Sequence, residues 1–483
     1  MDTPQIILLS VAFSILLLLF VLVVRALLFK PRREEDFKSE PVFFDADKAV
    51  NDLCDMIRCR TVSDKLRENE DEAEFLKFKE LLPELFPEVF KTCVLETPSD
   101  RSILLKWQGK SSVSPTVLMA HYDVVSVVEE KWEKPPFSGE IDENGVIWGR
   151  GAIDTKITLN GILEAAQTLI KSGFIPENDV YFAFAGDEEV NGYGARAIVK
   201  LFQERGITPG IVVDEGGAVV NNVFPGVSTP CALVGIAEKG MVNIEYSVNG
   251  GGGHASSPKP HTPIGKLSEA CVRMEKNPFK LRLCDPTKKL FDTLGRYSTF
   301  LYRIIFSNLW LFKPVLNILT KKTGGELNAL MRPTTAFTMM EGSRGMNVIP
   351  AYASMISNHR IIPGETVDSV VETIKATAEP AGVSVRLVEG TDPSVISKTD
   401  CDAYERVVKA IKGTWNGVLV SPYLMVACSD SRHWGVVSDC VYRFSAMALS
   451  AEERATIHGN NERVPVKTVA KTVEFYIRLL SLS

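Results

Sequence analysis

The chain has 483 residues, of which 45% are hydrophobic and 24% charged, and a formal net charge of −6. This composition is typical of a folded globular protein and argues against a largely disordered or fibrous one. The length favours two folded units, and the absence of a long basic tract argues against nucleic acid as a partner.

The N-terminal segment departs from this soluble pattern. Residues Ile6 to Val24 are uncharged, and as a helix they would measure about 28 Å, enough to cross a bilayer. A cleaved signal peptide is the alternative, but Asp2 and the lack of an early Lys or Arg favour an uncleaved, single-pass anchor. Basic residues follow the apolar run, so the positive-inside rule predicts a cytoplasmic main body.

Nine cysteines are scattered along the chain without a C-x-x-C pair. This pattern argues against a disulfide framework and suits a reducing compartment. Any bound metal is therefore expected to be held by histidines and carboxylates rather than by thiolates.

After Asp45, short apolar runs alternate with amphipathic stretches, which predicts an α/β sheet covered by helices. Three runs end directly before polar residues: Thr116–Ala120 before His121, Tyr181–Ala185 before residues 187–189, and Ile211–Val213 before Asp214. Ligands bind at the carboxyl ends of strands in open α/β sheets, so these residues are expected at one rim. A helical apolar pattern from Leu159 places Asp154 in the loop before an amphipathic helix.

A second unit is expected from residue 240, where Val242, Ile244, Tyr246 and Val248 alternate with polar residues as in a half-buried antiparallel strand. It is predicted to continue through a strand into Arg360 and a helix over Val367–Ala378. The expected organisation is an anchor (1–29), a linker (30–41), a main α/β domain (42–239 and 393–483) and an inserted α+β domain (240–392).

Within this inserted unit, residues 298–322 are rich in apolar and aromatic side chains. Arg303, Asn308 and Lys313 interrupt the run, so a second membrane span is not expected. Buried packing of extra helices is the favoured interpretation, and an apolar wall for a lipid-like substrate or a membrane contact is the alternative.

The polar residues supply ligand types that suit zinc. His121 and Asp123 form an H-x-D triplet, in which a carboxylate can hold the other ring nitrogen of a ligating histidine. Each piece alone is more often structural, but together they offer two imidazoles and several carboxylates, from His121, Asp154, the acids at 187–189, Asp214 and His458. Such oxygen-rich sites also admit manganese or cobalt.

The chain resembles a family of di-zinc peptidases and deacylases through eight motifs in order: HYDVV, WEKPPFSG, GRGAIDTK, GDEEVNGYGA, VVDEGG, NVIP, SDSR and IHGNNE. The family contains aminoacylase, carboxypeptidase G, carnosinase and succinyl-diaminopimelate desuccinylase. The resemblance covers nearly everything after the linker and is strongest to the branch of vacuolar carboxypeptidase S and the N-fatty-acyl-amino acid hydrolase.

The resemblance implies that the main domain is catalytic and that the inserted domain is a lid or dimerisation domain. It also implies two Zn²⁺ ions per chain and a role for each site residue. Asp154 would bridge the ions, with His121 and Asp214 completing one site and Glu189 and His458 the other. Asp123 would orient His121, and Glu188 would act as the general base.

Further roles implied by the resemblance concern the substrate. His254 would stabilise the oxyanion in the active site of a partner chain, which requires a homodimer, although some relatives are monomeric. Asn347 and Arg360 would recognise a substrate carboxylate. One departure from the family pattern is Thr155, where many relatives have a second Asp after the bridging one.

The leading hypothesis is hydrolysis of an amide bond next to a free carboxylate, in an N-acyl amino acid or a short peptide. A membrane-tethered binding protein without turnover is an alternative, because one fold can host unrelated functions. A deacylase of a succinylated diamino acid is a third reading, which the long apolar insertion makes less attractive.

Overall fold

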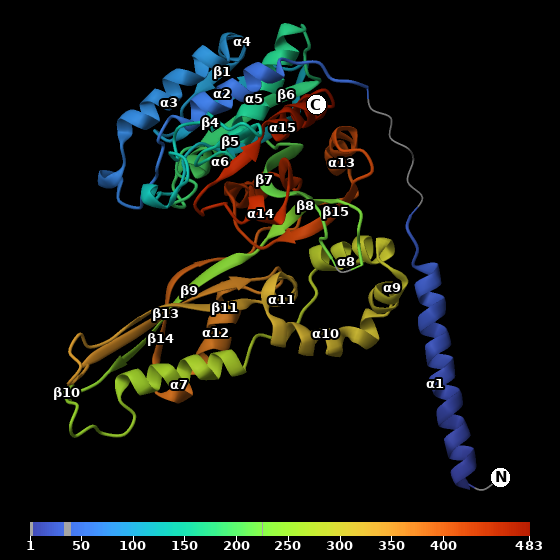
Figure 1. Ribbon diagram of the computed structural model, residues 1–483, viewed down its shortest axis with the longest axis vertical. Coiled ribbons are helices and arrows are strands. Elements are labelled where there is room, and N and C mark those ends of the chain that lie inside the picture. The colour runs from blue at the N-terminus through green and yellow to red at the C-terminus, as the bar shows by residue number, and fades with distance from the viewer. Residues whose placement is uncertain (1–2, 33–39, 225) are drawn as a thin grey trace.

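The computed structural model describes residues 3–32, 40–224 and 226–483. Figure 1 shows a body built around a large sheet, a second unit around a smaller sheet, and helix α1 (Thr3–Leu28) standing apart from both. The predicted mixed α/β fold is confirmed, since both sheets carry helices on their faces.

The body contains an eight-stranded mixed sheet. In spatial order its strands are β1 (Val94–Glu96), β2 (Ser102–Trp107), β6 (Asn178–Ala185), β3 (Ser111–His121), β7 (Ile211–Val220), β16 (Val441–Leu449), β8 (Cys231–Glu238) and β15 (Leu419–Met425). Strands β6, β3, β7 and β16 run parallel to one another. Apart from the first four residues of β3, their side chains are almost all buried, as expected for strands covered on both faces.

Helices pack on this sheet and close its core. They are α2 (Ala46–Ile57), α3 (Glu72–Leu85), α4 (Pro87–Thr92), α5 (Lys156–Lys171), α6 (Gly194–Glu204), α13 (Asp402–Thr414), α14 (Ala451–Arg454) and α15 (Val466–Leu480). Helix α5 follows Asp154 as predicted and lies against α15. Gly161 permits this approach, because an added Cβ would stand 2.5 Å from Thr472 of α15. A small sheet of β4 (Glu140–Ile141), β5 (Val146–Trp148) and β17 (Arg463–Pro465) borders the body.

The second unit is a four-stranded antiparallel sheet with two helices. Its strands, in spatial order, are β11 (Thr334–Glu341), β13 (Tyr352–Ile361), β9 (Gly240–Asn249) and β14 (Ser384–Thr391). The apolar face of β9 is buried under α7 (Pro263–Lys276) and α12 (Val367–Ala378). Helix α12 has the predicted bounds, and the Thr366 side chain caps its first turn. A short pair, β10 (Gly253–His254) with β12 (Val348–Ile349), lies at the end of this sheet far from the body (Figure 1).

Four helices connect the second unit to the body: α8 (Asp285–Tyr297), α9 (Phe300–Ser307), α10 (Leu309–Thr323) and α11 (Gly325–Met331). The apolar run at 298–322 thus forms α9 and α10. The inner residues of these two helices pack on the core, but much of their apolar surface is exposed. The expected buried packing is therefore found on only one side of α9 and α10.

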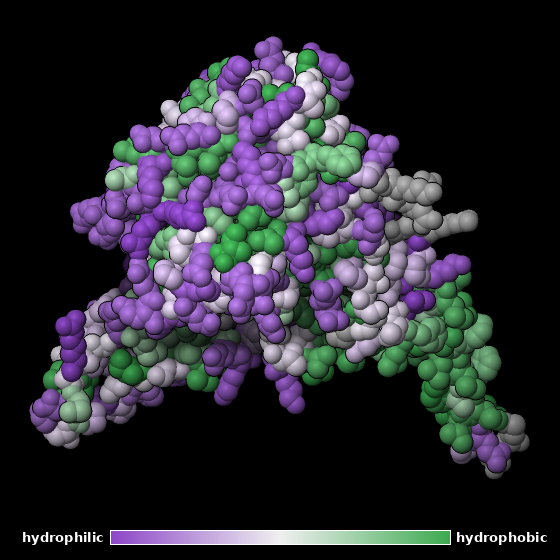
Figure 2. Space-filling view, turned by 45° about the horizontal axis from the view of Figure 1, so that its top comes forward, coloured by the Kyte–Doolittle hydropathy of each residue, from purple (hydrophilic) through white to green (hydrophobic). Residues whose placement is uncertain are grey.

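Helix α1 is the one described helix long and apolar enough to cross a membrane, by its length and composition. Figure 2 shows it as a hydrophobic rod projecting from a body with a largely hydrophilic surface. A membrane anchor and a signal sequence both satisfy this test. All nine cysteines lie among the described residues, and none forms a disulfide.

Candidate metal centre

Three neighbouring parallel strands deliver acidic and imidazole side chains to one edge of the large sheet. Strand β3 ends at His121, and β6 ends just before the acids at 187–189. Strand β7 carries Asp214 and Glu215. The sequence predicted that Asp214 directly follows a strand. Because β7 runs on to Val220, Asp214 instead lies inside this strand.

Two triads of possible metal ligands share Asp154. One combines Asp154 with His121 and Glu215, and the other combines it with Glu189 and His458. His121 Nε2 lies 3.0 Å from Asp154 Oδ1, and His458 Nε2 lies 2.9 Å from Asp154 Oδ2. The two carboxylate oxygens of Asp154 thus face different histidines, as a bridging ligand requires.

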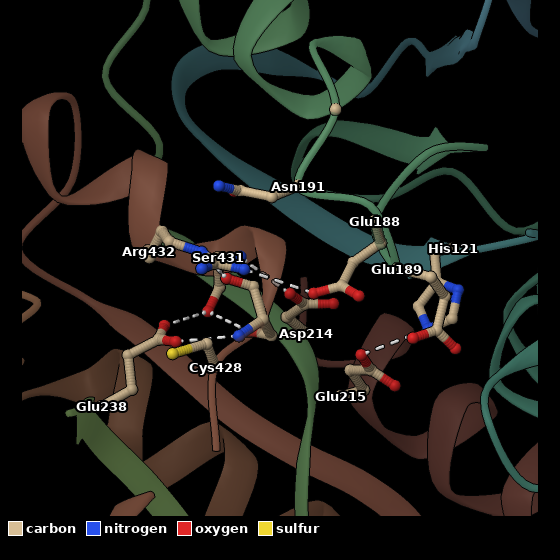
Figure 3. A network of polar contacts seen from close by, with 12 residues as sticks. His121, Glu188, Glu189, Asn191, Asp214, Glu215, Glu238, Cys428, Ser431 and Arg432 are labelled. Carbon is tan, nitrogen blue, oxygen red and sulfur yellow. Dashed lines mark hydrogen bonds and ion pairs between the residues drawn. The ribbon is translucent and has the colours of Figure 1, made fainter. Parts of the chain in front are cut away.

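Asp214 is absent from both triads, which departs from the sequence-based ligand set. Its Oδ2 accepts a hydrogen bond from the Ser431 backbone N–H at 2.9 Å. The neighbouring Glu215 places Oε1 3.4 Å from His121 Nε2 instead (Figure 3). The pairing of β7 with β16 shifts register between Asp214 and Gly217, so regular side-chain alternation does not hold here, and of the two acids Glu215 is the one whose oxygen lies within ion-pair distance of His121.

Asp123 connects the two sides of the centre. It lies beside the His121 ring, with 3.4 Å between Nδ1 and Oδ1. Its carboxylate also accepts backbone N–H bonds from Glu188 at 3.1 Å and Glu189 at 3.0 Å. Asp123 is fully buried, so these bonds fix the loop that presents both glutamates.

Glu462 holds the Asp154 loop, and the sequence analysis missed this role. Its carboxylate accepts backbone N–H bonds from Ile153 at 2.7 Å and Asp154 at 3.1 Å, and it pairs with Arg150 at 2.7 Å. Both charged side chains are buried. The residue stands in the IHGNNE motif four places after His458, which was the available signal.

The electrostatics of the centre favour a cation. Burial raises the pKa of Glu189, and it raises that of Glu215 to about 8. Hydrogen bonds to Asp154 and Glu189 raise the pKa of His458 to about 10. Several carboxylates with two imidazoles in a small space suit divalent ions, whose charge would offset the mutual repulsion of the acids.

Glu188 lies beside the triads but belongs to neither. Burial and the nearby Asp430 raise the pKa of its carboxyl well above the usual value. Arg432 Nη2 lies 3.3 Å from Glu188 Oε1, and Figure 3 shows Glu188 between Arg432 and His121. A buried carboxyl with a raised pKa, held by a neighbouring cation, is suited to moving a proton.

A cavity of about 460 Å³ opens directly from the centre. At one end it is lined by Asp154, Glu188, Glu189, Glu215 and His458. The rest of its wall is mostly apolar and comes from β7, β8, β15 and β16, with Ala218, Val220, Leu233, Tyr423, Met425, Met447 and Leu449. The cavity thus joins a polar reaction end to an apolar chamber.

The three remaining predicted residues lie in two places. Arg360 is near the cavity, with its Nη1 3.0 Å from Sγ of Cys428 in the cavity wall. His254 and Asn347 lie together, because the Ala255 N–H donates to the Asn347 carbonyl at 2.9 Å. Both are exposed at the end of the second unit far from the triads, so one chain alone does not bring them to the centre (Figure 1).

Comparison with known proteins identifies the family. The model of peptidase family M20/M25/M40 matches residues 117–482. The chain belongs to this family. It is 37% identical to probable carboxypeptidase S-like 2 of Dictyostelium discoideum, over 85% of this chain and 79% of that protein.

Other similarities of this M20 chain agree with that assignment. It is 35% identical to the N-fatty-acyl-amino acid synthase/hydrolase PM20D1 of Xenopus tropicalis, over 94% of this chain and 89% of that protein. Its fold matches an M20 metallo-carboxypeptidase of Sulfolobus solfataricus with a TM-score of 0.64 at 17% identity, over 90% of this chain and 98% of the other. The predicted resemblance is thereby confirmed, and the chain is a hydrolase of the amide and peptide bond type.

Proposed function

We propose that this M20 chain hydrolyses N-acyl amino acids that carry a long apolar acyl group. The observation that carries this proposal is the apolar chamber continuous with the candidate metal centre. A scissile amide placed at the triads would direct its acyl chain along the apolar wall. A relative is named an N-fatty-acyl-amino acid synthase/hydrolase, which supports this substrate class.

The two triads would hold two divalent cations, with Asp154 shared between them. The donor set of imidazoles and carboxylates suits zinc, and manganese or cobalt also fit. On geometric grounds we assign Glu215, rather than Asp214, to the triad of His121. Cations bound there would supply the Lewis acidity that polarises the scissile carbonyl and lowers the pKa of the attacking water.

Glu188 would carry the proton between the two halves of the reaction. Its carboxylate accepts a proton as water attacks the carbonyl carbon, and it returns this proton to the amide nitrogen as the C–N bond breaks. The products are a carboxylic acid and a free amino acid. Arg432 holds the Glu188 carboxylate on the side away from His121.

Recognition of the amino acid half would draw on the second unit. Arg360 contacts Cys428 of the cavity wall, and its guanidinium can pair with a carboxylate. His254 and Asn347 lie too far along the second unit to reach the centre of their own chain, so in this proposal they act in the centre of a second copy.

The test uses the full chain in detergent with a series of N-acyl derivatives of one amino acid. We expect kcat/KM to rise roughly tenfold for each added pair of methylenes until the chamber is filled, because each buried methylene contributes about 0.8 kcal/mol. Dipeptides serve as the comparison. A flat response to acyl length, or faster cleavage of polar dipeptides, would contradict the proposal.

A further inference from the structure

Near its C-terminal end, helix α1 contacts the connecting helices α8 and α9. Along the described part of this helix, every residue from Thr3 to Val21 is exposed, and burial begins at Leu22 and Ala26. The exposed part would measure about 28 Å at ~1.5 Å per residue, close to the ~30 Å hydrocarbon thickness of a bilayer. If α1 spans a bilayer, Leu22 therefore marks the boundary between hydrocarbon and headgroups.

The junction of α9 and α10 meets α1 at this level. Asn308 Nδ2 donates to the Leu22 carbonyl at 3.2 Å, and Arg25 Nη2 donates to the Ser307 carbonyl at 2.8 Å. One turn further along, Arg296 of α8 stacks on the Phe29 ring at 4.4 Å. These contacts fix the height of α9 and α10 relative to the apolar helix.

The outer side of α9 and α10 carries exposed apolar residues. We call this surface the apolar platform. It consists of Phe300, Leu301, Trp310, Val315, Ile318 and Leu319, which are between 44% and 70% exposed. Exposed Lys313, Lys321 and Lys322 flank it on α10. Apolar residues beside lysines, with a tryptophan among them, are typical of helices that lie at a membrane surface.

We propose that the apolar platform lies in the interfacial layer of the bilayer that α1 spans. Figure 1 supports this arrangement, because α10 runs across the direction of α1 near the end where α1 joins the body. The platform side chains would enter the outer acyl region, and the flanking lysines would remain among the headgroups. The proposal rests on α1 spanning a membrane and is independent of the reaction proposed above.

A bilayer accounts for the platform better than a second copy of the chain. The junction contacts place the platform next to the exposed length of α1, so any bilayer around α1 would reach it. A dimer built on the platform would bring a second transmembrane helix and its charged flank to the same place. We therefore assign the platform to lipid and treat a covering protein chain as an outcome of the test.

Trp310 is a built-in probe for this contact. Of the six tryptophans, all within the described residues, it alone is exposed. The full chain is reconstituted into phosphatidylcholine vesicles with acyl chains that are either plain or brominated near the headgroup. Bromine on the lipid is expected to quench part of the emission of the wild-type chain but none of the emission of Trp310→Phe.

Two variants make the test specific to the platform. Ile318→Glu is expected to reduce the quenching, whereas Ile175→Glu, at an exposed apolar residue of the body, should leave it unchanged. Equal unfolding temperatures would show that both substitutions are local. Identical quenching of the wild-type and Trp310→Phe chains would overturn the proposal. So would a chain that does not float with vesicles, or cross-linking between two copies of the Ile318→Cys variant through the introduced thiol.

Discussion

The choice between Glu215 and Asp214 as metal ligand can be decided by exchanging each carboxylate for its amide. Glu215→Gln replaces the carboxylate of one of the three possible ligands in the His121 triad by a neutral and weaker amide ligand. Loss of an outer-shell partner alone typically weakens metal binding 10–100-fold, about 1.4 to 2.7 kcal/mol, so loss of a direct ligand should exceed this range. We expect the purified variant to hold about one ion per chain instead of two.

Asp214→Asn is the matched control. The amide oxygen can still accept the Ser431 N–H, and the triads keep all their members. Its metal content, measured by plasma mass spectrometry after dialysis, should therefore equal that of the wild-type chain. The reverse result, with metal lost from Asp214→Asn and kept in Glu215→Gln, would refute the assignment from side-chain distances and restore the ligand set expected from sequence.

Three further predictions concern the base, the chamber and the Asp154 loop. Glu188→Gln should lower kcat by about 10²–10⁴-fold while the metal content stays unchanged, because proton transfer by a positioned group contributes that much; full activity would exclude the assigned base. Leu233→Trp should fill the chamber and reduce kcat/KM for long acyl chains more than for short ones, and an equal loss for both would contradict the location of the acyl site. Glu462→Ala should lower the free energy of unfolding by about 3–5 kcal/mol, because it leaves Arg150 as an unpaired buried charge. The exposed pair of Lys398 with Asp439 is the control, and its loss should leave the free energy of unfolding nearly unchanged in the same urea titration.

The strands that position the centre could be predicted because buried strands have a recognisable sequence pattern. A strand covered on both faces needs a continuous apolar run, and the polar residue that ends the run then marks the edge of the sheet. This reasoning located His121 and the acids at 187–189. It did not indicate Glu215, because the sequence does not show how far β7 continues beyond its apolar run or which of two adjacent acids lies nearer to His121. Asp214 as a metal ligand stays a prediction.

Other features depend on distant parts of the chain. The hydrogen bond from Asp154 to Glu462 joins residues 308 positions apart. The residues around each of the two positions give no sign that they are in contact. The apolar run at 298–322 poses a different problem, since its composition alone does not tell a core from a lipid-facing surface. That distinction needed the contact between Asn308 and Leu22, which the sequence pattern cannot supply.

The chamber and the apolar platform meet at helix α11. This helix begins two residues after α10 ends, and its Glu326 lines the cavity that opens from the metal centre. A long-chain N-acyl amino acid is an amphiphile, and its free energy of transfer into a bilayer becomes more favourable with each methylene of its acyl chain. If the platform rests on the bilayer, such a substrate lies close to the cavity rim before it leaves the lipid. Ile318→Glu should then lower kcat/KM for long-chain substrates presented in vesicles, and leave the rate unchanged for short-chain substrates in solution. A uniform loss on both would show that the substitution had disturbed the centre itself.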